Sequence, residues 1–113
     1  SVFMIEAKRL SRDHRDYVKN PNGGIERFKR EQDGFGKHLN QSAMIGYIQQ
    51  ENKEYWSTKI NRWIVELIGS ETDIDWNNGD KLVQNCDVSD FISNHQRVSG
   101  NPITLYHFWI NLN

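Results

Sequence analysis

Apolar and polar residues along the chain follow two different periods, and each period predicts a kind of element. The opening stretch, residues 2–10, starts with four apolar residues and predicts a strand. Residues 42–49 form a short apolar run, which is typical of a buried strand, and we expect it beside the first. Residues 52–68 carry apolar side chains at helical spacing and are followed by Gly69, so they predict the longest helix.

The segments between these elements give weaker signals. Residues 11–19 predict a short helix, which the Asn/Pro/Gly-rich residues 20–24 end. Residues 25–32 predict a second helix, and residues 70–80 predict a polar loop that contains a turn. The side chains of the second helix expected to face inward are Ile25, Phe28 and the stem of Lys29.

The C-terminal third predicts three strands. They cover residues 81–88, 91–98 and 103–112, with a hairpin connection between the last two. The final strand is apolar on both faces, so we expect it to be buried under a helix on one side and against another layer or a partner subunit on the other. Together the elements predict an α/β domain with a central mixed sheet flanked by helices.

Composition limits the class of protein. A chain of 113 residues with 36% hydrophobic content and a mean hydropathy of -0.79 fits one folded domain. Cys86 has no second cysteine to pair with, which favours a reducing compartment and a cytoplasmic location. No apolar run is long enough to span a bilayer, so no membrane association is expected.

Charge is distributed unevenly along the chain, although the net charge is only -1. Residues 8–38 contain nine Lys and Arg against five Asp and Glu, whereas residues 39–113 contain five against nine. This asymmetry favours a local anion-binding face near the start of the chain over a uniformly basic protein; the alternative is an ordinary mixed-charge surface.

The opening strand also carries the strongest candidate chemistry. In an extended strand Glu6 and Lys8 lie on the same face, because side chains alternate with a period of two. A carboxylate and an ammonium side by side could hold a hard cation and stabilise the charge of a scissile phosphate. The alternative is an ordinary ion pair at the end of a strand.

Three runs in this order resemble a known group of proteins. The runs are IEAKRL at residues 5–10, GIERF at residues 24–28 and MIGYI at residues 44–48. With the order of the predicted elements, they resemble the C-terminal portion of small bacterial nucleases of the restriction-endonuclease-like superfamily, which is named for its PD-(D/E)xK motif. The resemblance extends over the whole chain in element order, but its chemical motif is three residues long.

The resemblance implies a metal-dependent DNA endonuclease. Glu6 would be a ligand of Mg²⁺ or Mn²⁺, the backbone carbonyl of Ala7 would be a further ligand, and Lys8 would orient the attacking water or stabilise the transition state. A second Glu-x-Lys, at residues 51–53, opens a helix, where residues two apart point in different directions.

One feature of the family is missing from the sequence. The family places a catalytic Asp on the strand before Glu-x-Lys, and no residue before Glu6 can take this role. We expect the chain to be a fragment of a longer protein whose first elements lie upstream. The alternative is a catalytically inactive module of the same fold that binds nucleic acid or protein.

Four cations near the motif are candidate phosphate contacts, and DNA is the expected partner. They are Arg9, Arg27, Lys29 and Arg30. The four histidines are scattered and lack a cysteine partner, so a zinc site is not expected. His95 and His107 could face each other across the terminal hairpin, where hydrogen bonding within the sheet is their expected role. A homo-oligomer built on the final strand is a further possibility.

Overall fold

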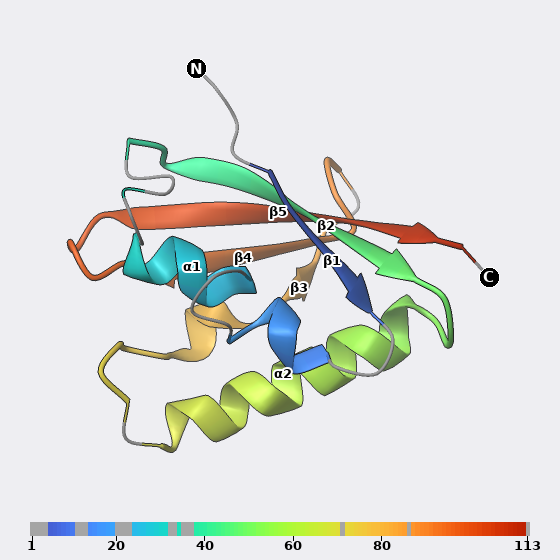
Figure 1. Cartoon of the computed structure of the whole chain (residues 1–113), viewed down its shortest axis with the longest axis horizontal. Coiled ribbons are helices and arrows are strands. Elements are labelled where there is room, and N and C mark those ends of the chain that lie inside the picture. Colours follow the sequence, from blue (N-terminus) through green and yellow to red (C-terminus); the bar gives the residue numbers. More distant parts are fainter. Residues whose placement is uncertain are drawn as a thin grey trace.

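A five-stranded sheet forms the centre of the protein (Figure 1). The computed structural model describes residues 5–10, 14–19, 24–31, 34, 38–70, 72–85 and 87–112. In chain order the elements are β1 (Ile5–Leu10), the 3-10 helix η1 (His14–Tyr17), α1 (Gly24–Arg30), β2 (Gln41–Ile48), α2 (Lys53–Ile68), the 3-10 helix η3 (Asn78–Asp80), β3 (Val83–Gln84), β4 (Phe91–Gln96) and β5 (Pro102–Asn111).

The strand order in the sheet is β1-β2-β5-β4-β3. β1, β2 and β5 run parallel to one another, while β4 is antiparallel to β5 and β3 is antiparallel to β4. The predicted mixed sheet is therefore confirmed, as is the position of the 42–49 strand beside the first. β1 forms one edge of the described sheet, and only its inner side pairs with another strand.

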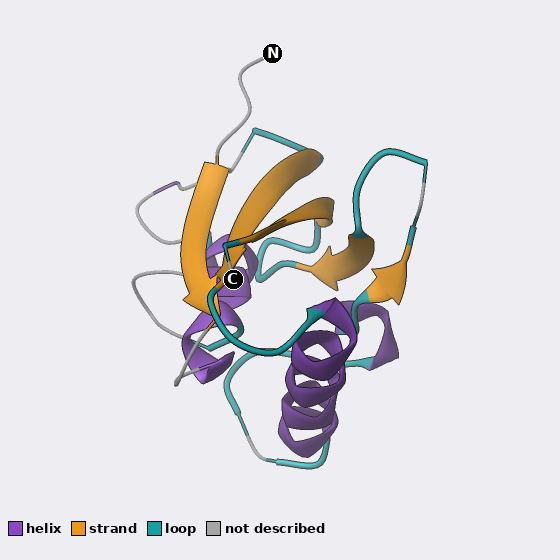
Figure 2. Ribbon diagram, turned by 90° about the vertical axis from the view of Figure 1, so that its right-hand side faces the viewer, coloured by secondary structure: helices purple, strands orange, loops and turns teal. Residues whose placement is uncertain are grey.

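The two faces of the sheet have different surroundings. Helices α1 and α2 and both 3-10 helices lie on one side, inside the curve of the sheet (Figure 2). We call this side the covered face; on β2 its residues are buried, whereas the alternate residues are partly exposed. We call the other side the open face. Its described positions are Ala7, Arg9, Gln41, Ala43, Ile45, Tyr47, Val83, Ile92, Asn94, Gln96, Pro102, Thr104, Tyr106, Phe108 and Ile110.

Helix α2 forms where the sequence predicts it. The side chain of Asn52 accepts a hydrogen bond from the Tyr55 backbone N–H at 2.8 Å and so caps the first turn. Gly69 follows the last helical residue. The buried residues of α2 are Trp56, Ile60, Ile64 and Leu67, and they pack into the core between the helix and the sheet. None of the described helices is long and apolar enough to cross a membrane.

The strand predicted at residues 81–88 is much shorter than expected. β3 contains only Val83 and Gln84 because the backbone before it bonds elsewhere. The amide of Asn61 on α2 accepts from the Leu82 N–H at 2.7 Å and donates to the Leu82 carbonyl at 2.9 Å. Both backbone groups of Leu82 therefore bond to α2, so they do not pair with a neighbouring strand.

The final strand is buried on one face only within the described chain. Ile103, Leu105 and Trp109 lie on the covered face and are almost fully buried. On the open face Phe108 and Ile110 are 36% and 44% exposed. The expected second cover of this strand is not supplied by any described residue.

Candidate functional site

The Glu-x-Lys pair lies on the edge strand β1. The register aligns Glu6 with Met44 and Lys8 with Gly46, on the same side of the strand as buried Leu10. Lys8 is half-buried, and the side chain of Glu6 lies outside the described part of the chain. The predicted shared face is thus the covered face of the sheet, beneath η1 and α1.

Next to Lys8, the sheet has a position without a side chain. Gly46 lies between Lys8 on β1 and Trp109 on β5. A Cβ atom at Gly46 would be 2.7 Å from Cδ1 of Trp109, closer than real contacts allow. The indole of Trp109 therefore occupies the space above Gly46, the residue that aligns with Lys8 in the sheet.

A complete metal site is not formed by the described residues. Among them, no group of three or more His, Cys, Asp or Glu side chains is placed to hold a metal ion. Glu6 and the carbonyl of Ala7 would give a hard cation only two ligands from this strand, and Mg²⁺ prefers six oxygen ligands. The chain fits the implied metal only if a further carboxylate comes from outside the described residues.

The four predicted phosphate contacts are separated by the fold. Arg27 is half-buried on α1, on the same side of the sheet as Lys8. Arg9 is exposed on the open face and so points away from the Glu-x-Lys side. Arg30 donates to both Asp73 oxygens at 2.7 and 2.6 Å and to Glu26 at 2.8 Å. These hydrogen bonds from Arg30 lower the pKa of Asp73 to about 2.

Lys29 is not a surface cation. Its side chain is 1% exposed, and Nζ donates to Oδ1 of Asp80 at 2.8 Å. The ammonium also lies 4.7 Å from the ring centre of Trp76. A phosphate in solvent cannot reach Lys29 in this position, so its predicted role as a phosphate contact does not fit the structure.

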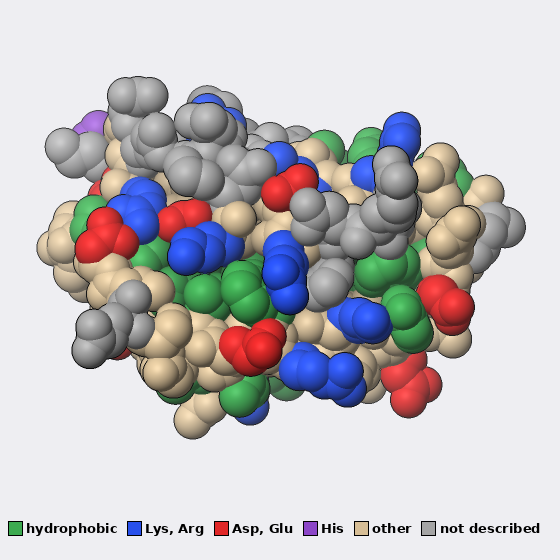
Figure 3. Space-filling view, turned by 60° about the horizontal axis from the view of Figure 1, so that its bottom comes forward, with side chains coloured by type: hydrophobic (Ala, Val, Ile, Leu, Met, Phe, Trp, Pro, Cys, Tyr) green, Lys and Arg blue, Asp and Glu red, His purple; other side chains and the backbone are tan. Residues whose placement is uncertain are grey.

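Part of the uneven charge along the sequence is paired in space. Lys29 and Arg30, from the basic segment, pair with Asp80 and Asp73, from the acidic remainder. On the side of the molecule that α2 occupies, Lys and Arg side chains alternate with Asp and Glu (Figure 3). The described surface on this side therefore carries no large patch of one sign.

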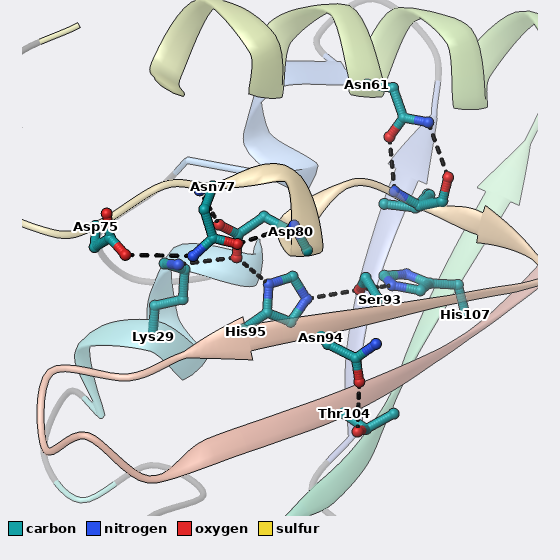
Figure 4. A network of polar contacts seen from close by, with 12 residues as sticks. Lys29, Asn61, Asp75, Asn77, Asp80, Ser93, Asn94, His95, Thr104 and His107 are labelled. Atoms are coloured by element: carbon teal, nitrogen blue, oxygen red, sulfur yellow. Dashed lines mark hydrogen bonds and ion pairs between the residues drawn. The ribbon is translucent and has the colours of Figure 1, made fainter. Parts of the chain in front are cut away.

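A chain of polar side chains runs through the core on the covered face (Figure 4). Oδ1 of Asp80 accepts from Lys29 and lies 2.5 Å from Nδ1 of His95, while Oδ2 accepts from the Asn77 backbone N–H at 2.7 Å. Nε2 of His95 lies 2.6 Å from Oγ of Ser93. Lys29, Asp80, Ser93 and His95 are each at most 1% exposed.

The polar chain continues on β5 and η1. Oγ of Ser93 lies 2.7 Å from Nε2 of His107, and Nδ1 of His107 lies 2.5 Å from the hydroxyl of Tyr17. Nε1 of Trp109 donates to the same hydroxyl at 3.0 Å. We call the whole set the polar relay: Lys29, Asp80, His95, Ser93, His107, Tyr17 and Trp109. It connects α1, η3, β4, β5 and η1.

The direction of every bond in the polar relay follows from its two ends. The indole of Trp109 can only donate, so the Tyr17 hydroxyl accepts from it and donates to Nδ1 of His107. Nε2 of His107 then donates to Ser93, and the Ser93 hydroxyl donates to Nε2 of His95. Nδ1 of His95 donates in turn to the carboxylate of Asp80. Each hydrogen bond of the polar relay therefore has one donor and one acceptor.

The pKa shifts agree with this arrangement. Burial lowers the pKa of His95 and lowers that of His107 well below its usual value, so both are neutral near pH 7. Burial alone would raise the pKa of Asp80, but hydrogen bonds from His95 and Lys29 keep it below its usual value. Burial raises the pKa of Tyr17, which therefore keeps its proton.

Ser93, His95 and Asp80 are connected in the same order as the triad of a serine hydrolase. The hydroxyl of Ser93 is 1% exposed and is already bonded to a second histidine. A substrate carbonyl therefore has no route to Oγ past the described residues. In this conformation the polar relay connects elements of the core, and the described residues close its serine to solvent.

Sequence reasoning found only part of this set. His95 and His107 were predicted to approach each other across the hairpin, and the structure joins them through Ser93, which the pattern did not single out. Asp80 falls in a predicted turn, where Asn77 and Asp80 form a capping box around η3. The Asn-x-x-Asp spacing could have shown the capping box, but not the burial of the carboxylate.

A hollow with a volume of about 920 Å³ lies beside the start of α2. Nζ of Lys53, from the second Glu-x-Lys, donates to Asp90 at 2.7 Å at its rim. The other oxygen of Asp90 accepts from the Trp109 backbone N–H at 2.7 Å. Glu54 is a further charged side chain of the lining, so the hollow does not favour an anion.

Comparison with known proteins gave no relative. No protein-family model, no curated protein and no solved structure matches the chain. The fold and the site therefore define the class of protein only as an α/β domain with a five-stranded mixed sheet.

Proposed function

We propose that the chain is the catalytic portion of a Mg²⁺-dependent DNA endonuclease, with Glu6 as a metal ligand and Lys8 as the catalytic cation. The observation that carries the proposal is the placement of these two residues at alternate positions of one edge strand, on the face shared with Arg27. A carboxylate, an ammonium and a guanidinium on one side of a strand suit phosphodiester hydrolysis.

The position of β1 in the sheet supports this reading. Its inner edge pairs with β2, and its outer edge is not paired by any described strand. A strand that bears the second carboxylate, from the same polypeptide or from another chain, therefore has room to bond there. Glu6 and that carboxylate would hold the metal ion, which would supply an activated water. Lys8 would stabilise the negative charge that develops on the phosphate.

The test compares two Glu-x-Lys motifs in the same chain. Cleavage of plasmid DNA with Mg²⁺ or Mn²⁺ is measured for the assembled protein that includes the second carboxylate, as wild type, Glu6→Gln, Lys8→Ala and the matched control Lys53→Ala. We expect the first two variants to lose about 100-fold or more of the rate, as when a group that stabilises the transition state is removed. Lys53→Ala should cleave normally, because its ammonium is occupied by Asp90.

Calorimetric titration with Mg²⁺ gives an independent readout. Glu6→Gln should weaken metal binding, while Lys8→Ala should bind the metal at least as well as the wild type, because a nearby cation is removed. A wild type that does not cleave DNA, or a Lys8→Ala variant that cleaves at the wild-type rate, would overturn the proposal. Salt-dependent DNA binding without cleavage would instead support the inactive binding module.

A further inference from the structure

The open face of the sheet combines aromatic side chains with an almost complete lack of charge. Its centre is formed by Ile45 and Tyr47 on β2 and by Tyr106, Phe108 and Ile110 on β5. The register places these five residues in adjacent rows, Ile45 beside Phe108 and Tyr47 beside Ile110. Contiguous apolar side chains of this kind on a surface mark a binding site.

The apolar area extends toward the far edge of the sheet. Ile92 on β4 aligns with Tyr106, and Val83 on β3, which is 60% exposed, aligns with Ile92. Among the described open-face positions, Arg9 on the edge strand is the one charged side chain. Enrichment in aromatic residues and Arg, with charge excluded from the centre, is the composition of a protein–protein interface core.

We propose that the open face is a dimer interface for a second copy of this chain. The absence of charge at its described centre makes it complementary to itself, since no like charges would meet when two copies pack face to face. Nucleic acid is a poorer occupant, because phosphate binding needs several cations and the described face offers only Arg9.

The size of the face matches a weak, specific dimer. Four inter-strand spacings of about 4.8 Å and a strand of eight residues at about 3.3 Å per residue give roughly 500 Å² per copy. Two copies would bury about 1,000 Å², which is at the lower limit of specific interfaces. Two sheets in contact pack about 10 Å apart, so the side chains of the two open faces would interdigitate.

The test is sedimentation of the chain from micromolar to near-millimolar concentration. The wild type should change from monomer to dimer over this range, and Phe108→Glu should raise the dissociation constant about 30-fold or more. Ile110→Lys is a second variant on the same face. The matched control is Val65→Glu, which places a charge on exposed α2 and should dimerise like the wild type.

Circular dichroism identifies which variants fold, and only folded variants are compared. A wild type that stays monomeric at every concentration would overturn the proposal. So would dimers that persist in both Phe108→Glu and Ile110→Lys, or that Val65→Glu disrupts to the same degree. A monomer that binds single-stranded DNA through Phe108 would replace the second copy with nucleic acid as the occupant. DNA cleavage is measured separately, so failure of the dimer leaves the proposed nuclease untouched.

Discussion

Each face of the sheet carries side chains of the kind that is usually found on the other. On the covered face, Ser93, His95 and His107 are fully buried, while on the open face Phe108 and Ile110 are partly exposed. The buried polar groups are tolerated because each donor meets an acceptor and the relay ends on an ion pair. The exposed apolar groups have no such compensation within the described chain. The polar relay is fully paired within the chain, whereas the apolar side chains of the open face are only partly covered by described residues.

The strongest test of the covered face is removal of the buried carboxylate at the end of the polar relay. Asp80→Asn would leave Lys29 as a buried charge without a counter-charge and would weaken the bond from His95. We expect a loss of about 3 to 5 kcal/mol in the free energy of unfolding. Urea denaturation measures the change. The control, Asp87→Asn on an exposed loop, should leave the midpoint unchanged, and an equal shift in both variants would contradict the ion-pair role.

A second test compares a side-chain hydrogen bond on the covered face with one on the open face. Ser93→Ala would leave Nε2 of His95 and Nε2 of His107 unpaired in the core and should cost about 2 to 4 kcal/mol. On the open face, the Thr104 hydroxyl donates to Asn94 at 2.8 Å within reach of water. Thr104→Val should therefore cost no more than about 0.5 kcal/mol. Thermal melts measure the loss of stability in both variants. Similar losses would contradict the prediction, because they would show that water reaches the hydrogen bonds of the polar relay.

The smallest predicted effect is a loss of stability in mild acid. The folded protein keeps His95 and His107 neutral, while the unfolded chain binds protons near pH 6.5, so stability should fall as the pH drops below about 6.5. Two such groups account for up to about 2.5 kcal/mol between pH 7 and 5.5. Asp80, whose pKa is lowered, should add to the loss only below about pH 4.

Urea midpoints measured across this pH range check the acid effect. The groups that face the two rings are Asp80 and Lys29 for His95, and Tyr17 for His107. His38→Gln, at an exposed position, should keep the same acid dependence. A flat profile in the wild type would mean that the buried histidines are protonated in the folded state.

The sequence predicts the elements that have a strong local pattern. Helix α2 lies where expected because long helical spacing has one interpretation, and strand β2 because the length, the glycine and the flanks of its apolar run favour a strand over a helix. Strand β3 could not be predicted at its true length, because its start is set by Asn61, which is 21 residues distant from Leu82. A contact between distant residues leaves no local pattern.

The polar relay escaped prediction for a related reason. Alternation assigns β4 two faces but does not say which is buried, because each face has one apolar and two polar residues. Hydropathy therefore does not show that Ser93 and His95 point into the core. Lys29 was expected to bury its stem, and the structure buries its charge as well, because Asp80 is brought to it from another part of the chain.

The Trp109 indole occupies the space that a side chain at Gly46 would need. No side chain can be added at position 46 while the indole is present, since the gap to Cδ1 would be 2.7 Å. Replacing the indole with a smaller group would remove the hydrogen-bond donor to the Tyr17 hydroxyl. The effect would extend to His107, because the same hydroxyl bonds to its ring. In homologous chains a side chain at position 46 should therefore occur only together with a smaller residue at position 109.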